Sequence, residues 1–79
     1  MLWFVFYDIT NDKTRNDISS ILTHAGGVRV QYSGFVMESN RADVKVVEDI
    51  LRSLKMEKDD KIFLIPTCKQ CAEKVIIIK

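Results

Sequence analysis

The chain has 79 residues, a net charge of +1 and 47% hydrophobic residues. This length allows one small domain, residues 1–79, whose core lies near the lower size limit for independent stability. The near-neutral charge excludes the strongly basic balance typical of a dedicated nucleic-acid-binding protein. Any contact with nucleic acid must therefore depend on where individual Lys and Arg residues lie.

The apolar segments are too short for a membrane protein. The N-terminal apolar run covers only residues 2–7, whereas a membrane span needs about 20 residues. This run also lacks the basic region and the small-residue cleavage site of a signal peptide. We therefore expect a cytoplasmic protein with no membrane partner.

The N-terminal part of the chain predicts a strand followed by a helix. Leu2–Ile9 is aromatic and β-branched without a helical period, which is typical of a strand. Asn11 is a favourable N-cap for a helix whose apolar residues recur at helical spacing as far as Ala25. Two glycines, Gly26 and Gly27, then end this helix.

The middle of the chain predicts two strands and a second helix. Residues 28–33 alternate apolar and polar side chains, as a half-buried strand does. Gly34 allows a bend before a short strand that ends at Glu38. Asn40 caps the second helix. Its apolar stripe has spacings of three and four residues and consists of Val44, Val47, Leu51 and Leu54.

The C-terminal part predicts two more strands. A polar loop over residues 56–60 precedes a strand at Lys61–Pro66, and residues 74–78 form a further apolar run. The complete order is β-α-β-β-α-β with an added C-terminal strand. This order predicts an α+β fold of the ferredoxin-like, split βαβ kind.

The first strand is apolar on both faces, although helices in this fold cover only one face of the sheet. One side of the strand presents Leu2, Phe4 and Phe6, and the other presents Trp3, Val5 and Tyr7. Strands buried on both faces have this composition. A second copy of the chain is the simplest cover, so we expect a homodimer, with the last strand able to add to an edge of the partner's sheet. The alternative is that the chain's own last strand and loops cover this face.

Cys68 and Cys71 allow three interpretations. A zinc site needs two more ligands, and His24 is the only histidine. A redox pair normally leads a helix after the first strand of a thioredoxin-like unit, whereas this pair lies near the C-terminus, before an apolar run. We favour the third interpretation, a turn of partly buried residues without zinc.

Asp8 is the strongest candidate for a chemical role. A carboxylate at the end of a strand, with polar groups from the next strand nearby, can hold a hard metal ion against a phosphate. The alternatives are an Asx turn that enters the helix, or a buried carboxylate satisfied by backbone amides. The residues alone leave these possibilities open.

Short segments along nearly the whole chain match one protein family in order and spacing. They are Tyr7-Asp8-Ile9, Asn11-Asp12, Arg15, Arg29-Val30-Gln31-Tyr32-Ser33-x-Phe35, the run from Asp60 to Pro66, and Cys68-x-x-Cys71 followed by Lys74-Val75-Ile76. Together they resemble the small CRISPR-associated adaptation proteins of the Cas-two family. The chain departs from the family at Gly34, where Val is usual, and in the residues that end the third strand.

The resemblance implies a ferredoxin-like homodimer that acts in CRISPR spacer acquisition. Family dimers bridge dimers of a larger integrase partner and hold the duplex DNA to be inserted. Members are also described as Mg²⁺-dependent endonucleases acting on single-stranded RNA or duplex DNA. Asp8 carries over as the catalytic metal ligand, one from each chain across the two-fold axis. A scaffold without a physiological nuclease role is the alternative function.

Five residues are candidate contacts to nucleic acid: Lys13, Arg15, Arg29, Ser33 and Lys45. Arg15, Arg29 or Ser33 would contact a phosphate beside Asp8, since guanidinium groups match phosphate oxygens. Lys13 and Lys45 lie near the starts of the two helices, where N-termini favour phosphates. Dispersed charges of this kind are also typical of solvated helix faces.

Overall fold

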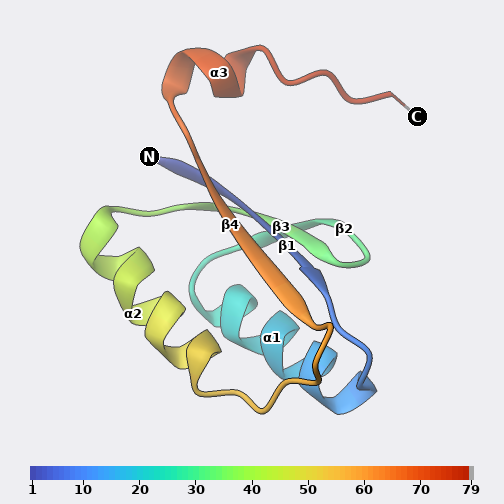
Figure 1. Cartoon of the computed structure of the whole chain (residues 1–79). Helices are drawn as coiled ribbons and strands as arrows, with labels where there is room; N and C mark the ends of the chain where they lie inside the picture. Colours follow the sequence, from blue (N-terminus) through green and yellow to red (C-terminus); the bar gives the residue numbers. More distant parts are fainter. Residues whose placement is uncertain (79) are drawn as a thin grey trace.

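The computed structural model describes residues 1–78 as a layer of two helices on a four-stranded sheet (Figure 1). The elements in chain order are β1 (Leu2–Asp8), α1 (Asp12–His24), β2 (Val28–Gln31), β3 (Gly34–Glu38), α2 (Arg41–Arg52), β4 (Lys61–Thr67) and α3 (Lys69–Glu73). The α+β fold with the predicted β-α-β-β-α-β order is confirmed. None of the helices formed by these residues has the length and apolarity needed to cross a membrane.

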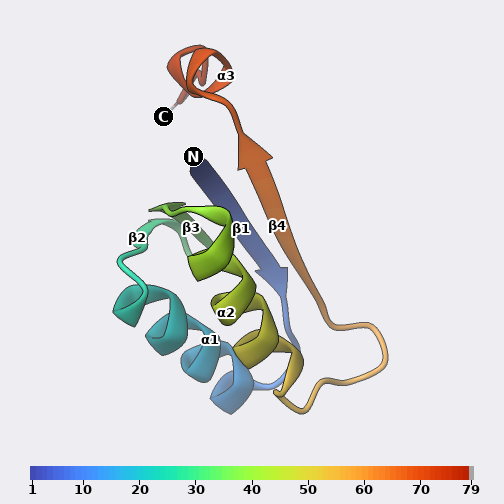
Figure 2. The same cartoon turned by 90° about the vertical axis from the view of Figure 1, so that its left-hand side faces the viewer.

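The sheet has the strand order β2-β3-β1-β4, and each pair of neighbours is antiparallel. The central strand β1 is therefore paired along both sides, while β2 and β4 are edges. The register with β4 runs from Leu2 opposite Thr67 to Asp8 opposite Lys61. A bulge between Arg29 and Gln31 interrupts the pairing of β2 with β3. Figure 2 shows α1 and α2 on the same face of this sheet.

Both helices begin at the predicted caps. The Asn11 side-chain oxygen accepts a hydrogen bond from the Thr14 amide at 3.2 Å, and that of Asn40 accepts one from the Asp43 amide at 2.8 Å. Each bond satisfies a backbone donor that the helix itself leaves free. Gly26 follows the end of α1 with a φ of 89°, a conformation that glycine adopts without steric cost.

The core lies between the sheet and the two helices. Its buried residues are Val5, Tyr7, Ile9, Ile18, Leu22, Phe35, Met37, Val44, Val47 and Leu51. Trp3 is partly buried against this cluster. The side of β1 that carries Trp3 and Tyr7 therefore faces the helices, and the side that carries Phe4 and Phe6 faces away from them.

The predicted C-terminal strand over residues 74–78 is wrong for the single chain. Lys69–Glu73 instead form the short helix α3, and residues 75–78 have no regular secondary structure. Their side chains are strongly exposed, with Ile78 at 88%. A strand forms only beside a pairing partner. Figures 1 and 2 show that α3 carries this segment beyond the end of the chain's own sheet.

The sheet face opposite the helices remains uncovered. We call it the open face, and it carries Phe4, Phe6, Val36, Phe63 and Ile65. The Phe4 and Phe6 rings stack with centroids 6.3 Å apart, and Phe63 is 51% exposed. The alternative in which the chain's own last segment covers this face is therefore wrong for the described residues.

Candidate metal and phosphate site

Asp8 is the last residue of β1, and its side chain is exposed. Side chains alternate between the two faces along a strand. The flanking residues Tyr7 and Ile9 are buried in the core at 5% and 4% exposure. The carboxylate of Asp8 therefore projects on the open face, in the same row as Phe4 and Phe6. At this point β1 is paired with β4, through Asp8 opposite Lys61, whereas its pairing with β3 ends at Phe6.

The Asp8 carboxylate is free of local partners. It takes part in no hydrogen bond or ion pair with residues 1–78, and the helix-capping role belongs to Asn11. The structure thus does not place Asp8 in either alternative role, as an Asx turn or as a buried carboxylate. Lys61 lies opposite Asp8 in the register of β1 with β4, which brings a cation to the same edge of the open face.

A single chain offers only part of a metal site. Among residues 1–78, no three His, Cys, Asp or Glu side chains gather to hold an ion. Magnesium nevertheless binds through one or two carboxylates when waters and substrate phosphates complete its octahedron. The uncommitted Asp8 carboxylate is therefore a donor of the kind that Mg²⁺ uses.

Asp60 fixes the loop that follows Asp8. Its Oδ1 accepts hydrogen bonds from the Thr10 amide at 3.0 Å and from the Thr10 hydroxyl at 3.1 Å. Its Oδ2 accepts one from the Glu57 amide at 2.9 Å. These bonds, led by that from Glu57, lower the pKa of Asp60. We define these contacts as the Asp60 latch, because they tie the loop after β1 to the loop before β4.

Arg29, a predicted phosphate contact, is engaged on the helix side of the sheet. Its guanidinium donates to the Ser19 hydroxyl at 2.5 Å and to the Tyr32 carbonyl at 2.9 Å. It also lies 5.2 Å from the centre of the Phe35 ring. Arg29 therefore connects β2 to α1. Its side chain lies on the helix side of the sheet, whereas Asp8 lies on the open face.

Arg15 and Ser33 lie nearer the Asp8 end of the sheet. Arg15 pairs with Asp12 and lies 5.6 Å from the centre of the Tyr32 ring. The Ser33 carbonyl accepts the Tyr7 amide at 3.0 Å, so Ser33 adjoins the end of β1. Burial raises the pKa of Tyr7, and the positive charges of Arg29 and Arg15 oppose that shift.

The two predicted lysine contacts belong to opposite ends of the helix layer. Lys13 is paired with Asp17 at 3.1 Å and Lys45 with Asp49 at 3.0 Å, both four residues further along the helix. Because α1 and α2 run in opposite directions, their first turns are far apart (Figure 2). Lys13 shares the Asp8 end of the molecule and Lys45 does not. A single chain therefore does not join the two lysines into one basic patch.

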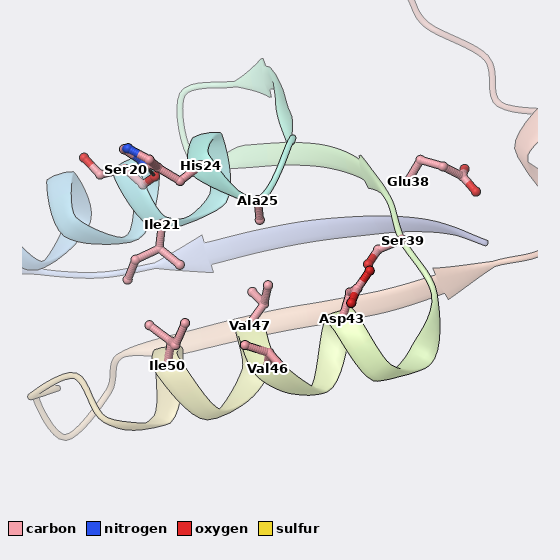
Figure 3. Close-up of a pocket in the computed structure, with 10 residues that line it drawn as sticks. All are labelled: Ser20, Ile21, His24, Ala25, Glu38, Ser39, Asp43, Val46, Val47 and Ile50. Atoms are coloured by element: carbon pink, nitrogen blue, oxygen red, sulfur yellow. Dashed lines mark hydrogen bonds between the residues drawn. The ribbon is translucent and has the colours of Figure 1, made fainter.

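A groove of about 570 Å³ between α1 and α2 contains none of the predicted site residues (Figure 3). Its lining is Ser20, Ile21, His24, Ala25, Glu38, Ser39, Asp43, Val46, Val47 and Ile50. His24, the only histidine, lies here at the end of α1, with Nδ1 2.8 Å from the Ser20 carbonyl oxygen. Asp8 lies at the opposite end of α1, so His24 is not its general base.

Sequence reasoning missed Lys61 and the Asp60 latch. Both depend on contacts between residues about fifty positions apart in the chain, such as Thr10 with Asp60. Residues 62–65 form a continuous apolar run without alternation, so the sequence contains no cue. Only the antiparallel register of β1 with β4 sets Lys61 and Asp8 on one face.

The architecture defines a ferredoxin-like α+β domain whose candidate carboxylate borders an uncovered apolar sheet face. The family model described as "CRISPR associated protein Cas2" matches residues 1–75 of this chain, and the chain belongs to that family.

Two curated relatives have related names. "CRISPR-associated endoribonuclease Cas2 1" of Archaeoglobus fulgidus is 37% identical over 78 residues, covering 99% of this chain and 83% of the relative. "CRISPR-associated endoribonuclease Cas2" of Korarchaeum cryptofilum is 36% identical over 64 residues, covering 81% and 69%.

Two crystal structures show the same fold. Streptococcus pyogenes Cas2 superposes with a TM-score of 0.86 at 23% identity, and both chains are covered completely, at 100%. The hypothetical protein TT1823 from Thermus thermophilus superposes with a TM-score of 0.85 at 24% identity, covering 99% of this chain and 89% of the other.

Proposed function

We propose that this chain acts as a homodimer in CRISPR spacer acquisition and cleaves nucleic acid with Mg²⁺ held by Asp8 from both copies. The observation that carries the proposal is the shared row of Asp8, Phe4 and Phe6 on the open face. The apolar side chains of this row are left uncovered by the chain's own elements, and a second copy would bury them. If two copies meet through the row, each contributes an Asp8 carboxylate to the region between them.

The residues of the chain supply binding and orientation. When bound, Mg²⁺ stabilises charge on a phosphate and lowers the pKa of a coordinated water. The Asp8 carboxylate would hold the ion, and Lys61 would attract the phosphate. The pairing of Asp8 with Lys61 of β4 and the Asp60 latch would keep the carboxylate in place. Ser33 remains a candidate phosphate contact at this end of the sheet, and Arg15, on α1, is a candidate contact on the helix side.

The proposed substrates are single-stranded RNA and duplex DNA. The name endoribonuclease borne by the two relatives supports RNA. Contacts from Asp8-bound metal and from Lys or Arg address phosphates rather than bases, so we expect little dependence on sequence. With a net charge of only +1, binding by the protein alone should be modest and sensitive to salt.

A non-catalytic scaffold is the second candidate function. It is supported by the absence of a cluster of metal-ligating side chains around Asp8 within residues 1–78 and by the position of His24, remote from Asp8. In this function the dimer would bridge integrase dimers and hold duplex DNA, with Lys13, Arg15 and Lys45 as backbone contacts. Such a protein needs a surface of the right shape and no group that activates water.

The substitution Asp8→Asn separates the two functions, because it keeps the side chain's shape and removes its charge. Nuclease function predicts that Asp8→Asn or chelation of Mg²⁺ lowers cleavage of RNA and duplex DNA by at least about 100-fold, as loss of a group essential to catalysis does. The scaffold function predicts unchanged spacer integration with the integrase partner. Lys45→Glu should instead weaken duplex binding. Cleavage that survives both chelation and Asp8→Asn would contradict the assignment of Asp8.

A further inference from the structure

The two cysteines lie together on the surface, at the junction between β4 and the C-terminal segment. Both thiols are free and exposed. Cys68 immediately precedes α3, and Cys71 lies within it. The expected turn of partly buried residues is therefore wrong, and the pair leads a helical turn, as a redox pair does.

The geometry brings the two sulfur atoms to one side of this turn. The Cys71 amide donates a hydrogen bond to the Cys68 Sγ at 3.3 Å, so the Cys68 side chain folds back over the first turn of α3. Residues three apart at the start of a helix have Cα atoms within the span of about 4.4–6.8 Å that a disulfide requires. Closing the bond thus needs rotation of side chains rather than movement of the backbone.

The two thiols are chemically unequal. The hydrogen bond from the Cys71 amide, assisted by the Cys71 thiol, lowers the pKa of Cys68. The same thiol–thiol contact raises the pKa of Cys71. Because the thiolate is the nucleophile in disulfide chemistry, Cys68 is the better attacking group at neutral pH.

We propose that Cys68 and Cys71 form a thiol–disulfide exchange site for low-molecular-weight disulfides, with Cys68 attacking and Cys71 resolving. The Cys68 thiolate bonds to one sulfur of the small disulfide, whose S–S bond breaks and releases one thiolate. Cys71 then loses its proton to solvent and attacks the Cys68 sulfur, which displaces the second thiolate. Both leaving thiolates take up protons. The protein dithiol is oxidised to an intrachain disulfide, and the small disulfide is reduced to two thiols.

The surroundings favour this chemistry over metal binding. Within residues 1–78, no third Cys, His, Asp or Glu joins the pair to complete a metal site. The closed disulfide would fix the first turn of α3. That turn is the link from β4 to the apolar segment formed by residues 75–78 (Figure 1).

Oxidised glutathione at pH 7 is the probe, and intact-protein mass after acid quenching is the measurement. The wild-type protein should lose two hydrogen atoms and carry no adduct. Cys71→Ser should accumulate one glutathione adduct on Cys68. Cys68→Ser should form its adduct more slowly, because the backbone amide of residue 71 still lowers the pKa of Cys68 in Cys71→Ser.

The same reaction on unfolded protein is the control. In denaturant the contact between the two residues is lost, so the two variants should react at similar rates. The product formed by the wild type shows whether Cys68 and Cys71 form an intrachain disulfide. Stable adducts on both cysteines, an interchain disulfide, or no reaction would overturn the proposal. Equal rates for the two folded serine variants would overturn the assignment of the attacking and resolving roles.

Discussion

The carboxylate of Asp60 determines where the backbone runs between Asp8 and α1. It accepts three hydrogen bonds from Thr10 and Glu57. The two bonds from Thr10 join residues fifty positions apart, and the bond from Glu57 lies within the loop before β4. A single side chain thus links the two loops at the Asp8 end of the sheet. If Asp8 needs a fixed position to hold an ion, then Asp60 is a positioning residue for it.

Asp60→Ala should lower the urea midpoint of unfolding at neutral pH. The pKa of Asp60 in the folded protein is below the usual aspartate value, chiefly because the Glu57 amide bonds to it. A lowered pKa means that the bonds contribute stability above the unfolded-state pKa, and that this contribution is lost as the pH falls through the folded-state pKa. The difference in urea midpoint between the wild type and Asp60→Ala should therefore become smaller as the pH falls from the unfolded-state pKa of Asp60 through its folded-state pKa.

The neighbouring exposed carboxylate provides the matched control for this measurement. Asp59→Ala removes the same charge without removing the latch, so its midpoint should remain close to that of the wild type. A gap for Asp60→Ala that stays constant as the pH falls, or an equal loss for Asp59→Ala, would show that the latch does not stabilise the fold.

At the scale of elements, helices α1 and α2 were predictable, whereas helix α3 and the absence of a last strand were not. Asn11 and Asn40 cap α1 and α2 as their sequences indicate, because capping and helical periodicity are local properties. Residues 75–78 have strand composition, but a strand exists only with a neighbour. Helix α3 has five residues, too few to show an apolar stripe.

At the candidate site too, the sequence revealed local features but not contacts between distant residues. Asp8 was found because it ends an apolar run, which is a local cue. Which side of β1 faces the helices is a property of the packed sheet, so the position of Lys61 opposite Asp8 and the structural role of Arg29 stayed hidden. Gly34 was a departure from the family pattern. A Cβ there would lie 2.8 Å from the Phe6 ring, so glycine makes room for that ring on the open face.

The segment formed by residues 75–78 should become a strand when two copies associate. Its apolar side chains are exposed, and the sheet has two edges available for pairing. Ile77→Pro removes a backbone donor that an added strand requires. We expect this variant to weaken dimerisation by about tenfold, roughly the loss of one or two net hydrogen bonds, in sedimentation equilibrium.

Ile77→Val is the control, since it keeps the backbone donor and the strand propensity. Amide hydrogen exchange gives an independent readout, and the amides of residues 75–78 should be protected in the dimer. Rapid exchange of these amides in a stable dimer, together with equal dimer affinity for the two variants, would contradict strand addition.

At the scale of the whole molecule, the chain is built with one covered and one uncovered sheet face. Trp3 and Tyr7 pack toward the helices, so a charge at either residue should unfold the domain rather than split a dimer. Phe4, Phe6 and Phe63 lie on the open face, in adjacent registers of β1 and β4. An apolar surface of this kind is typical of an interaction site.

Phe63→Glu should convert a dimer into a monomer without unfolding the domain. In the dimer, the introduced carboxylate would be an unpaired buried charge, which costs several kcal/mol and should weaken association at least about 100-fold. Light scattering at micromolar concentration should give twice the 9.1 kDa chain mass for the wild type and about that mass for the variant. Circular dichroism should be the same for both.

Val46→Glu is the matched control, because Val46 is a similarly exposed apolar residue, at 58% against 51% for Phe63, but lies on the helix layer. It should remain dimeric. Mg²⁺ then tests the link between the interface and Asp8. Two carboxylates brought together repel each other without an ion, so Mg²⁺ should raise the melting temperature of the wild type and of Val46→Glu. It should have little effect on Phe63→Glu or Asp8→Asn. A wild-type protein that stays monomeric, or a Phe63→Glu variant that stays dimeric, would show that the open face is not the surface through which two copies meet.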